Sequence, residues 1–420
     1  MTLRVLARAA FDAALTAADP AQAVHHALTA QPCDASQPLL ILSFGKAAVP
    51  MARAALATLS HPPKRCIIVT NPENAAPVTG AELHIAGHPV PDAAGLAAAQ
   101  VVLAAAHECG AQDQVLVLIS GGASAMLPCP IAGVSLTDKI ALSQLMLAAD
   151  LDIYAMNLVR QSLSQLKGGG LGRAIYPAKL RSLILSDVPG DDLRVVASGP
   201  TMPPIGTVSA AAAVLKSAKL WPDLPASIQR ALSRPASKPQ PLAPAITQLI
   251  GSNSVSVAAA RAAIPATFSP IIAPYPLVGP VGDAAKILAA LATTTPSDSP
   301  VALVTGGETT VHVTGTGTGG RNQDLALRMA IAFEANPPGR DWVFLSGGTD
   351  GRDGPTTAAG GFATPTTLAK IRAAGADPAA LLANNDSFAA LGLADDLLIT
   401  GATGTNVADI QILLMAASLP

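Results

Sequence analysis

The stretch TGGETTVHVTGTGTGGRNQD, residues 305–324, combines dense glycines with side chains that could bind an anion. Arg321 directly follows its last glycine pair. Glycines allow a backbone to approach a ligand closely and to turn with positive φ. A helix is predicted over residues 324–334, which would put Arg321 and free backbone N–H groups at a helix N-terminus, where anions are favoured. The other residues assigned to this anion or phosphate site are Glu308, Gly317, Gly319, Gly320 and Asn322.

A lysine in a similar setting follows the apolar run of residues 39–42. The chain continues as SFGK, in which Gly45 precedes Lys46, and a helix is predicted over residues 47–59. A strand, a glycine and a helix N-terminus in this order suit a phosphate. The segment is not a Walker A loop, because the first glycine and the hydroxyl residue of that motif are missing. The pattern fits both a phosphate-binding Lys46 and a plain strand-helix turn with an exposed lysine.

The run of residues 115–119 leads into SGGAS, a turn rich in glycine and hydroxyl groups. Successive free N–H groups in such a turn can form an anion-binding nest, although a plain Gly-Gly turn before a helix has the same sequence. A serine hydrolase is disfavoured, because no G-x-S-x-G motif surrounds Ser124 and no histidine can be assigned to it. The residues assigned to the nest are Ser120, Gly121, Gly122 and Ser124.

Carboxylates that could hold a divalent cation follow further apolar runs. Asp187 and Asp191 lie in SDVPGDD, directly after residues 183–185, and Asp350 lies in the glycine loop SGGTDGRDG. Mg²⁺ commonly takes one or two carboxylates and completes its octahedron with water and phosphate oxygens. The alternative is that these aspartates cap turns and helices. Asp187 is closest to its strand and is the strongest functional candidate of the group.

Other polar residues receive structural interpretations. The seven histidines show no zinc-binding spacing, and His88, in GHPVPD, is expected to support a tight turn. Lys167 precedes a run of glycines, and Arg160 lies on a predicted helix before it. We expect these two cations to belong to a solvated face.

The composition excludes several classes of protein. Of 420 residues, 50% are hydrophobic and 13% are charged, and the net charge is −2. Buried cores are therefore expected, and a basic nucleic-acid surface is not. No apolar run reaches the length of about 18 residues that a membrane span needs. The N-terminus is predicted to be an amphipathic helix, and the four cysteines form no C-x-x-C pair, which together predict a cytoplasmic protein with reduced thiols.

Apolar runs alternate with alanine-rich helical stretches along the chain. Continuous apolar runs are typical of strands buried on both faces, so the alternation predicts an α/β fold with a largely parallel sheet. Ligands of such folds bind beyond the carboxyl ends of the strands. The length favours two domains, and the proline-rich stretch of residues 233–244 predicts a division into residues 1–240 and residues 241–420.

Residues 315–320, GTGTGG, match the dinucleotide pattern G-x-G-x-x-G, which makes an NAD(P)-dependent oxidoreductase the main alternative. The match is incomplete, because the preceding residues 310–314 alternate in polarity and no acid ends a second strand about 20 positions further on. Phosphoryl transfer needs cations on the phosphates and a divalent metal on carboxylates. Lys46, Arg321 and Asp187 would supply these groups, so phosphoryl transfer accounts for more of the unusual turns.

The motifs FGKAA, GHPVPD, SGGASAM, SQLKGGGL, LSDVPGDD, ASGPT, GGETTVHVTGTGTGGRNQD, GGTDGRDGP and TGATGTNVADI occur in this order. Together they closely resemble the type II glycerate 2-kinases over nearly the whole chain. The resemblance implies a Rossmann-like N-terminal domain, a smaller C-terminal MOFRL domain with a mixed sheet, and an active site in the cleft between them. It also implies ATP- and Mg²⁺-dependent phosphorylation of D-glycerate to 2-phosphoglycerate. Many bacterial members carry the name hydroxypyruvate reductase, so an NAD(P)H-dependent hydroxypyruvate reductase remains the alternative.

In such enzymes the lysine of the GK motif and the arginine of GGRNQ are the proposed active-site cations, and they match Lys46 and Arg321. The SDVPGD carboxylates match Asp187 and Asp191. We expect the two cations to bind the glycerate carboxylate and the γ-phosphoryl group from opposite sides of the cleft. Asp187 would orient Mg²⁺ or accept the 2-hydroxyl proton, and Ser124 would donate its hydroxyl to substrate or phosphate. A third hypothesis is a non-catalytic sensor, and the resemblance leaves a monomer or a homodimer open.

Overall fold

The computed structural model describes residues 2–149, 151–188, 190–235, 240–294 and 298–417. The chain forms two compact units. The N-terminal unit is Pro20–Ile250, and the C-terminal unit combines Met1–Asp19 with Gly251–Pro420. Part of the proline-rich stretch used to divide the sequence, residues 236–239, lies outside the described residues.

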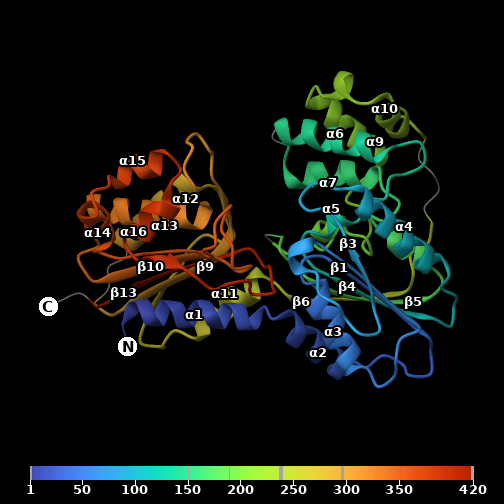
Figure 1. The fold of residues 1–420 in the computed structure, drawn as a ribbon, viewed down its shortest axis with the longest axis horizontal. Helices are drawn as coiled ribbons and strands as arrows, with labels where there is room; N and C mark the ends of the chain where they lie inside the picture. The colour runs from blue at the N-terminus through green and yellow to red at the C-terminus, as the bar shows by residue number, and fades with distance from the viewer. Residues whose placement is uncertain (1, 150, 189, 236–239, 295–297, 418–420) are drawn as a thin grey trace. The chain divides into compact units, whose positions relative to one another are not determined.

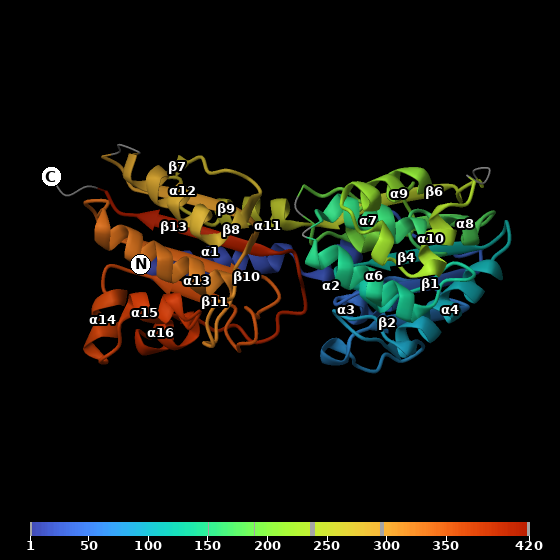
Figure 2. The same ribbon diagram turned by 90° about the horizontal axis from the view of Figure 1, so that it is seen from above.

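The N-terminal unit contains a six-stranded sheet in the order β3-β2-β1-β4-β5-β6. The registers from β3 to β5 are parallel, and the neighbours β4, β1 and β2 can be followed in Figure 2. This is the Rossmann strand order, and it reverses direction between β1 and β4, where such sheets bind ligands. The strands are β1 (Leu39–Phe44), β2 (Arg65–Thr70), β3 (Glu82–Ile85), β4 (Gln114–Ile119), β5 (Lys179–Leu185) and β6 (Ala245–Gly251).

Helices cover both faces of this sheet (Figure 1), which explains why its central strands are largely apolar and almost entirely buried. One face packs against α4 (Ala93–His107), α5 (Ala123–Met126) and α8 (Gly170–Ile175). The other carries α2 (Pro20–Ala30) and α3 (Ala48–Thr58). A separate apolar core joins α6 (Leu136–Ala148), α7 (Ile153–Ser162), α9 (Val208–Ser217) and α10 (Ala226–Leu232). Short 3₁₀ helices are η1 (Pro72–Asn74), η2 (Val196–Ser198) and η3 (Trp221–Asp223).

The C-terminal unit has a mixed seven-stranded sheet in the order β12-β11-β10-β13-β9-β7, with β8 also paired to β9. The pairs from β12 to β9 are antiparallel, and β7 and β8 run parallel to β9. The strands are β7 (Ser269–Ile271), β8 (Leu277–Pro280), β9 (Val301–Thr310), β10 (Trp342–Gly348), β11 (Gly360–Ala363), β12 (Leu397–Leu398) and β13 (Asp409–Met415).

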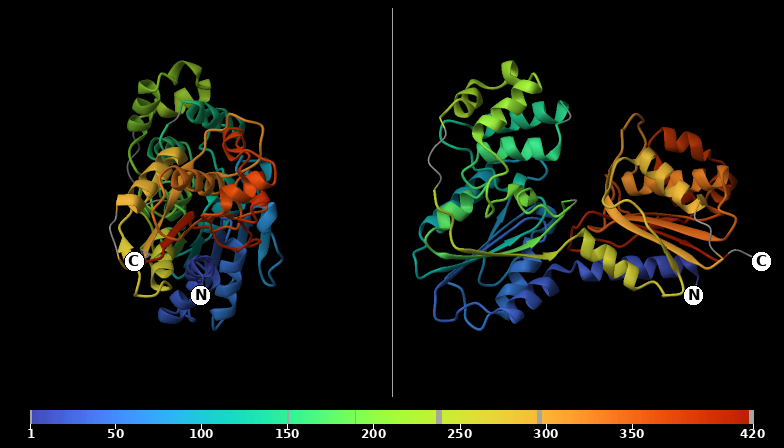
Figure 3. Two further views of the ribbon diagram at one scale, coloured as in Figure 1. Left: turned by 90° about the vertical axis from the view of Figure 1, so that its left-hand side faces the viewer. Right: turned by 180° about the vertical axis from the view of Figure 1, so that it is seen from behind.

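Alternate residues of β9, β10 and β13 enter two different cores of the C-terminal unit. One core lies under a layer of helices (Figure 1), namely α12 (Val281–Thr294), α13 (Arg321–Ala335), α14 (Thr367–Ala373), α15 (Pro378–Ala383) and α16 (Ser387–Leu393). The other lies against α1 (Leu3–Ala17) and α11 (Asn253–Ala262), which Figure 3 shows on the opposite face. The predicted helix over residues 324–334 is present, and it begins at Arg321 itself.

The sequence-based division at residue 240 differs from the packing at both ends of the N-terminal unit. Helix α1 was assigned to residues 1–240, but it buries Leu6, Ala7, Ala10, Phe11 and Ala14 in the C-terminal unit. Strand β6 was assigned to residues 241–420, but it belongs to the sheet of the N-terminal unit. Proximity in sequence does not decide which apolar face a helix meets. Among the described residues, no helix has both the length and the apolar character to cross a bilayer.

Candidate active site

Backbone hydrogen bonds join the turns after β1 and β4, at the point where the strand order reverses. The Lys46 N–H donates to the Gly121 carbonyl at 2.9 Å, and the Ser120 N–H donates to the Phe44 carbonyl at 3.0 Å. The Ser120 hydroxyl accepts the Ala47 N–H at 3.0 Å and is buried. Ser120 therefore holds the Lys46 turn, a role different from the predicted contact with a ligand.

Gly45 is required by this close approach. Its φ is +118°, and a Cβ there would lie 2.3 Å from the Ser120 Oγ. The position of Lys46 therefore depends on a glycine that no larger residue can replace without moving the β4 turn.

Asp187 lies beside the same turns, directly after β5. A Cβ on Gly121 would lie 2.0 Å from the Asp187 Oδ2, so the carboxylate faces the bare Cα of this glycine. Burial raises the pKa of Asp187, and the positive charge of Lys46 acts in the opposite direction. The structure thus brings Lys46, Asp187 and the Gly121-Gly122 turn together.

His88 also belongs to this group, although the sequence predicted only a structural turn. Gly122 has φ +83°, and a Cβ on it would lie 3.1 Å from the His88 Nε2. Burial lowers the pKa of His88, and the charge of Lys46 lowers it further. A neutral imidazole is therefore favoured at neutral pH, and it could accept or donate a hydrogen bond beside the two charged groups.

Gly121→Ala is expected to displace the Asp187 carboxylate and to lower kcat about 100-fold, the effect of misplacing a reacting group by about 1 Å. Steady-state turnover and the thermal midpoint should be measured together. Gly110→Ala is the matched control, because its added Cβ would meet nothing closer than 3.9 Å. Activity of Gly121→Ala equal to that of this control would show that the carboxylate position does not matter.

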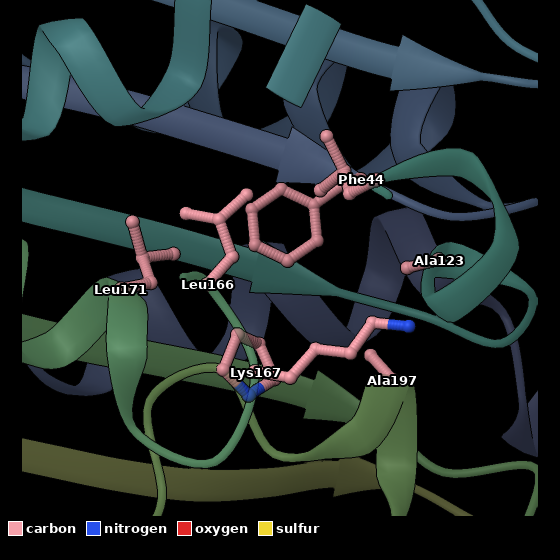
Figure 4. Close-up of a pocket in the computed structure, with 8 residues that line it drawn as sticks. Phe44, Ala123, Leu166, Lys167, Leu171 and Ala197 are labelled. Carbon is pink, nitrogen blue, oxygen red and sulfur yellow. The ribbon is translucent and has the colours of Figure 1, made fainter. Parts of the chain in front are cut away.

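Lys167 does not lie on a solvated face, and that prediction is wrong. The residue is only 6% exposed. It borders a cavity of about 10 Å³ with Phe44, Leu166 and Leu171, which has room for about one water molecule. Figure 4 shows its stem crossing this apolar lining with Nζ directed toward Ala123. Nζ donates to the Ser124 carbonyl at 2.7 Å and to the Ser124 Oγ at 2.8 Å. The glycine run after it suggested an exposed turn, whereas the flanking Leu166 and Leu171 were the available sign of burial.

In the C-terminal unit, Arg321 is held by two carboxylates. Its Nε donates to the Asp409 Oδ2 at 2.6 Å and its Nη2 to the Asp409 Oδ1 at 3.0 Å, a bidentate pair. Its Nη1 lies 3.0 Å from the Glu308 Oε1. Burial acts to lower the pKa of Arg321, but Asp409 and Glu308 raise it on balance. The guanidinium is therefore fixed in direction and permanently charged, and its side chain is 33% exposed.

The N-terminus of α13 is occupied by the protein's own carboxylate. The buried Asp353 accepts the backbone N–H groups of Asn322 at 3.1 Å and Gln323 at 2.8 Å, together with the Asn322 Nδ2 at 3.3 Å. The prediction that free N–H groups beside Arg321 bind an external anion is therefore wrong for these two groups. Burial raises the pKa of Asp353 to about 6, and the charge of Asp409 contributes in the same direction.

This raised pKa predicts a pH-dependent stability. Asp353 binds its proton more tightly in the folded chain than at its ordinary pKa of 3.8. Its stabilising contribution is then fully present below about pH 3.8 and is lost as the pH rises through about 6, with a magnitude of about 3 kcal/mol. Urea unfolding between pH 4 and 7 should show this decline, and Asp353→Asn should show a flatter profile whatever its absolute stability. If the free energy of unfolding changed with pH in the same way in the wild type and in Asp353→Asn, the raised pKa of Asp353 would be contradicted.

The GTGTGG loop and Thr314 before it use backbone N–H groups for hydrogen bonds within the protein. Thr314 and Gly315 donate to the Asn385 Oδ1, both at 2.8 Å, and Gly317 donates to the Asn384 carbonyl at 2.9 Å. A Cβ on Gly317 or Gly319 would collide with residues 384–387. This loop follows β9 of the mixed sheet, and the Rossmann strand order is in the other unit. The dinucleotide pattern therefore lacks the βαβ setting that gives it meaning.

The predicted metal ligands do not form a preassembled cage. Among the described residues, no three His, Cys, Asp or Glu side chains cluster in a way that could hold a metal ion. Asp187 and Asp191 are in the N-terminal unit, and Asp350 is in the C-terminal unit, where its Oδ1 accepts the Arg352 N–H at 3.0 Å. A single carboxylate such as Asp187 nevertheless suits Mg²⁺, which takes most of its ligands from water and phosphate oxygens.

Comparison with known proteins adds to this geometry. Residues 6–233 match the family model described as a domain of unknown function, DUF4147, and residues 301–409 match the MOFRL family. An Agrobacterium vitis protein provisionally named hydroxypyruvate reductase is 38% identical over 99% of this chain and 95% of its own. D-glycerate 2-kinase from Thermotoga maritima is 39% identical over 89% of this chain and 90% of its own. The crystal structure of glycerate kinase from Thermotoga maritima matches with a TM-score of 0.88 and 36% identity, covering 98% of this chain and 100% of the other.

Proposed function

The chain belongs to the family that joins a DUF4147 domain to a MOFRL domain and includes the glycerate kinases. We propose that it transfers the γ-phosphoryl group of ATP to the 2-hydroxyl of D-glycerate, giving 2-phosphoglycerate. The observation that carries the proposal is the convergence of Lys46, Asp187 and the Gly121-Gly122 turn where the Rossmann strand order reverses. A cation beside a buried carboxylate can bind an anion and accept or donate a proton at one place.

We assign the proton to Asp187. The 2-hydroxyl must lose a proton as it attacks, and a carboxylate whose pKa is raised by burial is a better base near neutral pH than an exposed one. The charge of Lys46 opposes this rise in the pKa of Asp187 and so favours the ionised carboxylate. This gives the lysine a role in addition to binding the glycerate carboxylate or the transferring group. His88, adjacent to Gly122, is available to orient a substrate oxygen.

We assign charge stabilisation in the transition state to Arg321. Phosphoryl transfer depends on positioning and electrostatics more than on covalent steps. The Asp409 and Glu308 carboxylates prevent rotation of the guanidinium, so its remaining N–H groups are presented in one direction. Mg²⁺ would neutralise charge on the ATP phosphates and take most of its ligands from water and phosphate oxygens. Because Asp187 is assigned to the proton, Asp191 of the same turn is the candidate protein ligand of the metal in the N-terminal unit.

The proposal is tested by a coupled assay that compares ATP with D-glycerate against NADH or NADPH with hydroxypyruvate. We expect ADP release that requires both D-glycerate and Mg²⁺, and no oxidation of the nicotinamide. Nicotinamide oxidation without ATP would favour the reductase, and ligand-dependent thermal stabilisation without turnover would favour a sensor. We propose a cytoplasmic enzyme that acts as a monomer or a homodimer.

A further inference from the structure

A chain of hydrogen bonds runs from the buried Lys167 to a backbone carbonyl of α7. The Lys167 Nζ lies 2.8 Å from the Ser124 Oγ, which lies 2.8 Å from the Ser198 Oγ. The Ser198 Oγ lies 2.6 Å from the Asn157 Oδ1, and the Asn157 Nδ2 donates to the Ile153 carbonyl at 2.9 Å. Ser198 and Asn157 are buried, whereas Ser124 is partly exposed. Of the side chains in this series of hydrogen bonds, only Ser124 can therefore offer a polar atom to a ligand.

The direction of every bond in the chain follows from its far end. A carbonyl oxygen only accepts, so the Ile153 carbonyl fixes the Asn157 amide with Oδ1 toward Ser198. Ser198 must then donate its single proton to Asn157, and it can only accept from Ser124. The Ser124 hydroxyl in turn donates its single proton to the Ser198 Oγ, so Lys167 must donate to the Ser124 Oγ.

Lys167 is therefore a donor to Ser124 and not a base that activates it. Its two N–H bonds to the Ser124 carbonyl and hydroxyl use all the protons of a neutral amine. Burial lowers the pKa of Lys167 well below its ordinary value, and the nearby cations Lys139 and Arg160 lower it further. The arrangement consequently differs from a serine-lysine nucleophile, in which the lysine must accept the serine proton.

A hydroxyl oxygen has two acceptor positions, and Lys167 occupies one of those on Ser124. The remaining position can accept a hydrogen bond but cannot donate one. A phosphate or carboxylate oxygen would meet another acceptor there, whereas an alcohol O–H would be matched. The expectation that Ser124 donates to phosphate is thus at odds with the bond directions.

We propose that Ser124 accepts a hydrogen bond from the non-reacting hydroxyl of the phosphoryl acceptor, and so selects a dihydroxy acid over a monohydroxy acid; this inference rests on the proposed kinase function. The reacting hydroxyl needs a base that takes its proton. Ser124 cannot serve as that base, because its own proton is committed to Ser198 and its neighbour Lys167 only donates. For D-glycerate the hydroxyl selected is the one on C3.

The test compares D-glycerate with D-lactate, which has the 2-hydroxyl but lacks the 3-hydroxyl. In Ser124→Ala we expect the ratio of kcat/KM for D-glycerate over D-lactate to fall about tenfold, the usual effect of leaving one hydrogen-bond partner unsatisfied. The KM for ATP should stay within about twofold. Calorimetric binding of each acid without nucleotide gives the same ratio independently of turnover.

Ser162→Ala is the matched control, because its hydroxyl donates only to the Leu158 carbonyl of its own helix, at 2.9 Å, and the ratio should not change. An unchanged ratio in Ser124→Ala, or a raised KM for ATP with the ratio intact, would overturn the inference and leave the kinase proposal standing. A wild-type chain that phosphorylates neither acid would overturn the kinase proposal. If that chain also bound both acids equally, the inference would fail with it.

Discussion

Arg321→Ala is expected to lower kcat with D-glycerate and ATP about 1000-fold, the effect of removing a positioned arginine from a phosphoryl-transfer site. The loss follows because charge on the transferring group would have no fixed guanidinium to stabilise it. The same substitution leaves the fully buried Asp409 without its bidentate partner. Breaking such a pair typically costs about 3–5 kcal/mol of stability, so the thermal midpoint should fall as well.

The two effects of Arg321→Ala can be separated with a second substitution. Arg321→Ala combined with Asp409→Asn removes the unpaired buried charge, so the double variant should regain most of the thermal stability. It should regain none of the turnover if the guanidinium acts in the reaction. Near-wild-type activity in either variant at a temperature where it is folded would remove Arg321 from the mechanism.

Lys46→Met is expected to reduce kcat/KM for D-glycerate by about 100-fold to 1000-fold, because the unbranched stem is kept while the charge is lost. A change in the pH profile should accompany this loss. Lys46 counteracts the burial that raises the pKa of Asp187, so its removal raises that pKa further. If Asp187 is the base, activity is lost as it becomes protonated, and the acidic limb of kcat/KM moves to higher pH in the variant.

The matched control is Lys64→Met, which removes a lysine of the same unit. The Lys64 Nζ lies 2.9 Å from the Asp113 Oδ1, and the two residues directly precede β2 and β4, at the amino ends of the strands and away from the carboxyl-end turns. Its rate and pH profile should equal those of the wild type. An unshifted acidic limb in Lys46→Met, despite a lower rate, would mean that the lysine binds an anion without acting on Asp187. Wild-type kinetics in Lys46→Met would exclude the lysine from the site.

The alternation of apolar runs and helices was enough to predict an α/β fold with strands buried on both faces. That prediction needs only nearby residues, because the apolar residues of a strand indicate that the strand is buried. The packing partners of a helix or strand cannot be inferred in this way, because they lie far away in the sequence. The amphipathic pattern of α1 predicts a helix with one buried face, but Phe11 and Leu6 fit the mixed sheet, which forms from residues far along the chain. The division at residue 240 could not reveal this.

The candidate site shows the same limit at the level of single side chains. Lys46, Asp187 and Gly121 were identified because each directly follows an apolar run, and parallel strands end at one edge of a sheet. Lys167 and His88 follow no such run, so their position beside the strand-end turns was not visible. Arg321 was identified because glycines precede it in the sequence. In the structure the Asp409 and Glu308 carboxylates hold the guanidinium, and the glycines allow residues 384–387 to pack closely against the loop.

The sequence by itself determined the fold class, the family and the strand-end residues, because these depend on residue type and order along the chain. The tertiary structure alone decided which of those groups have partners. It placed Asp353 on the α13 N–H groups, buried Lys167, and turned the Ser124 proton away from any ligand. A hydrogen bond commits a donor or an acceptor to one neighbour, and that neighbour is chosen by packing between segments that the sequence keeps far apart.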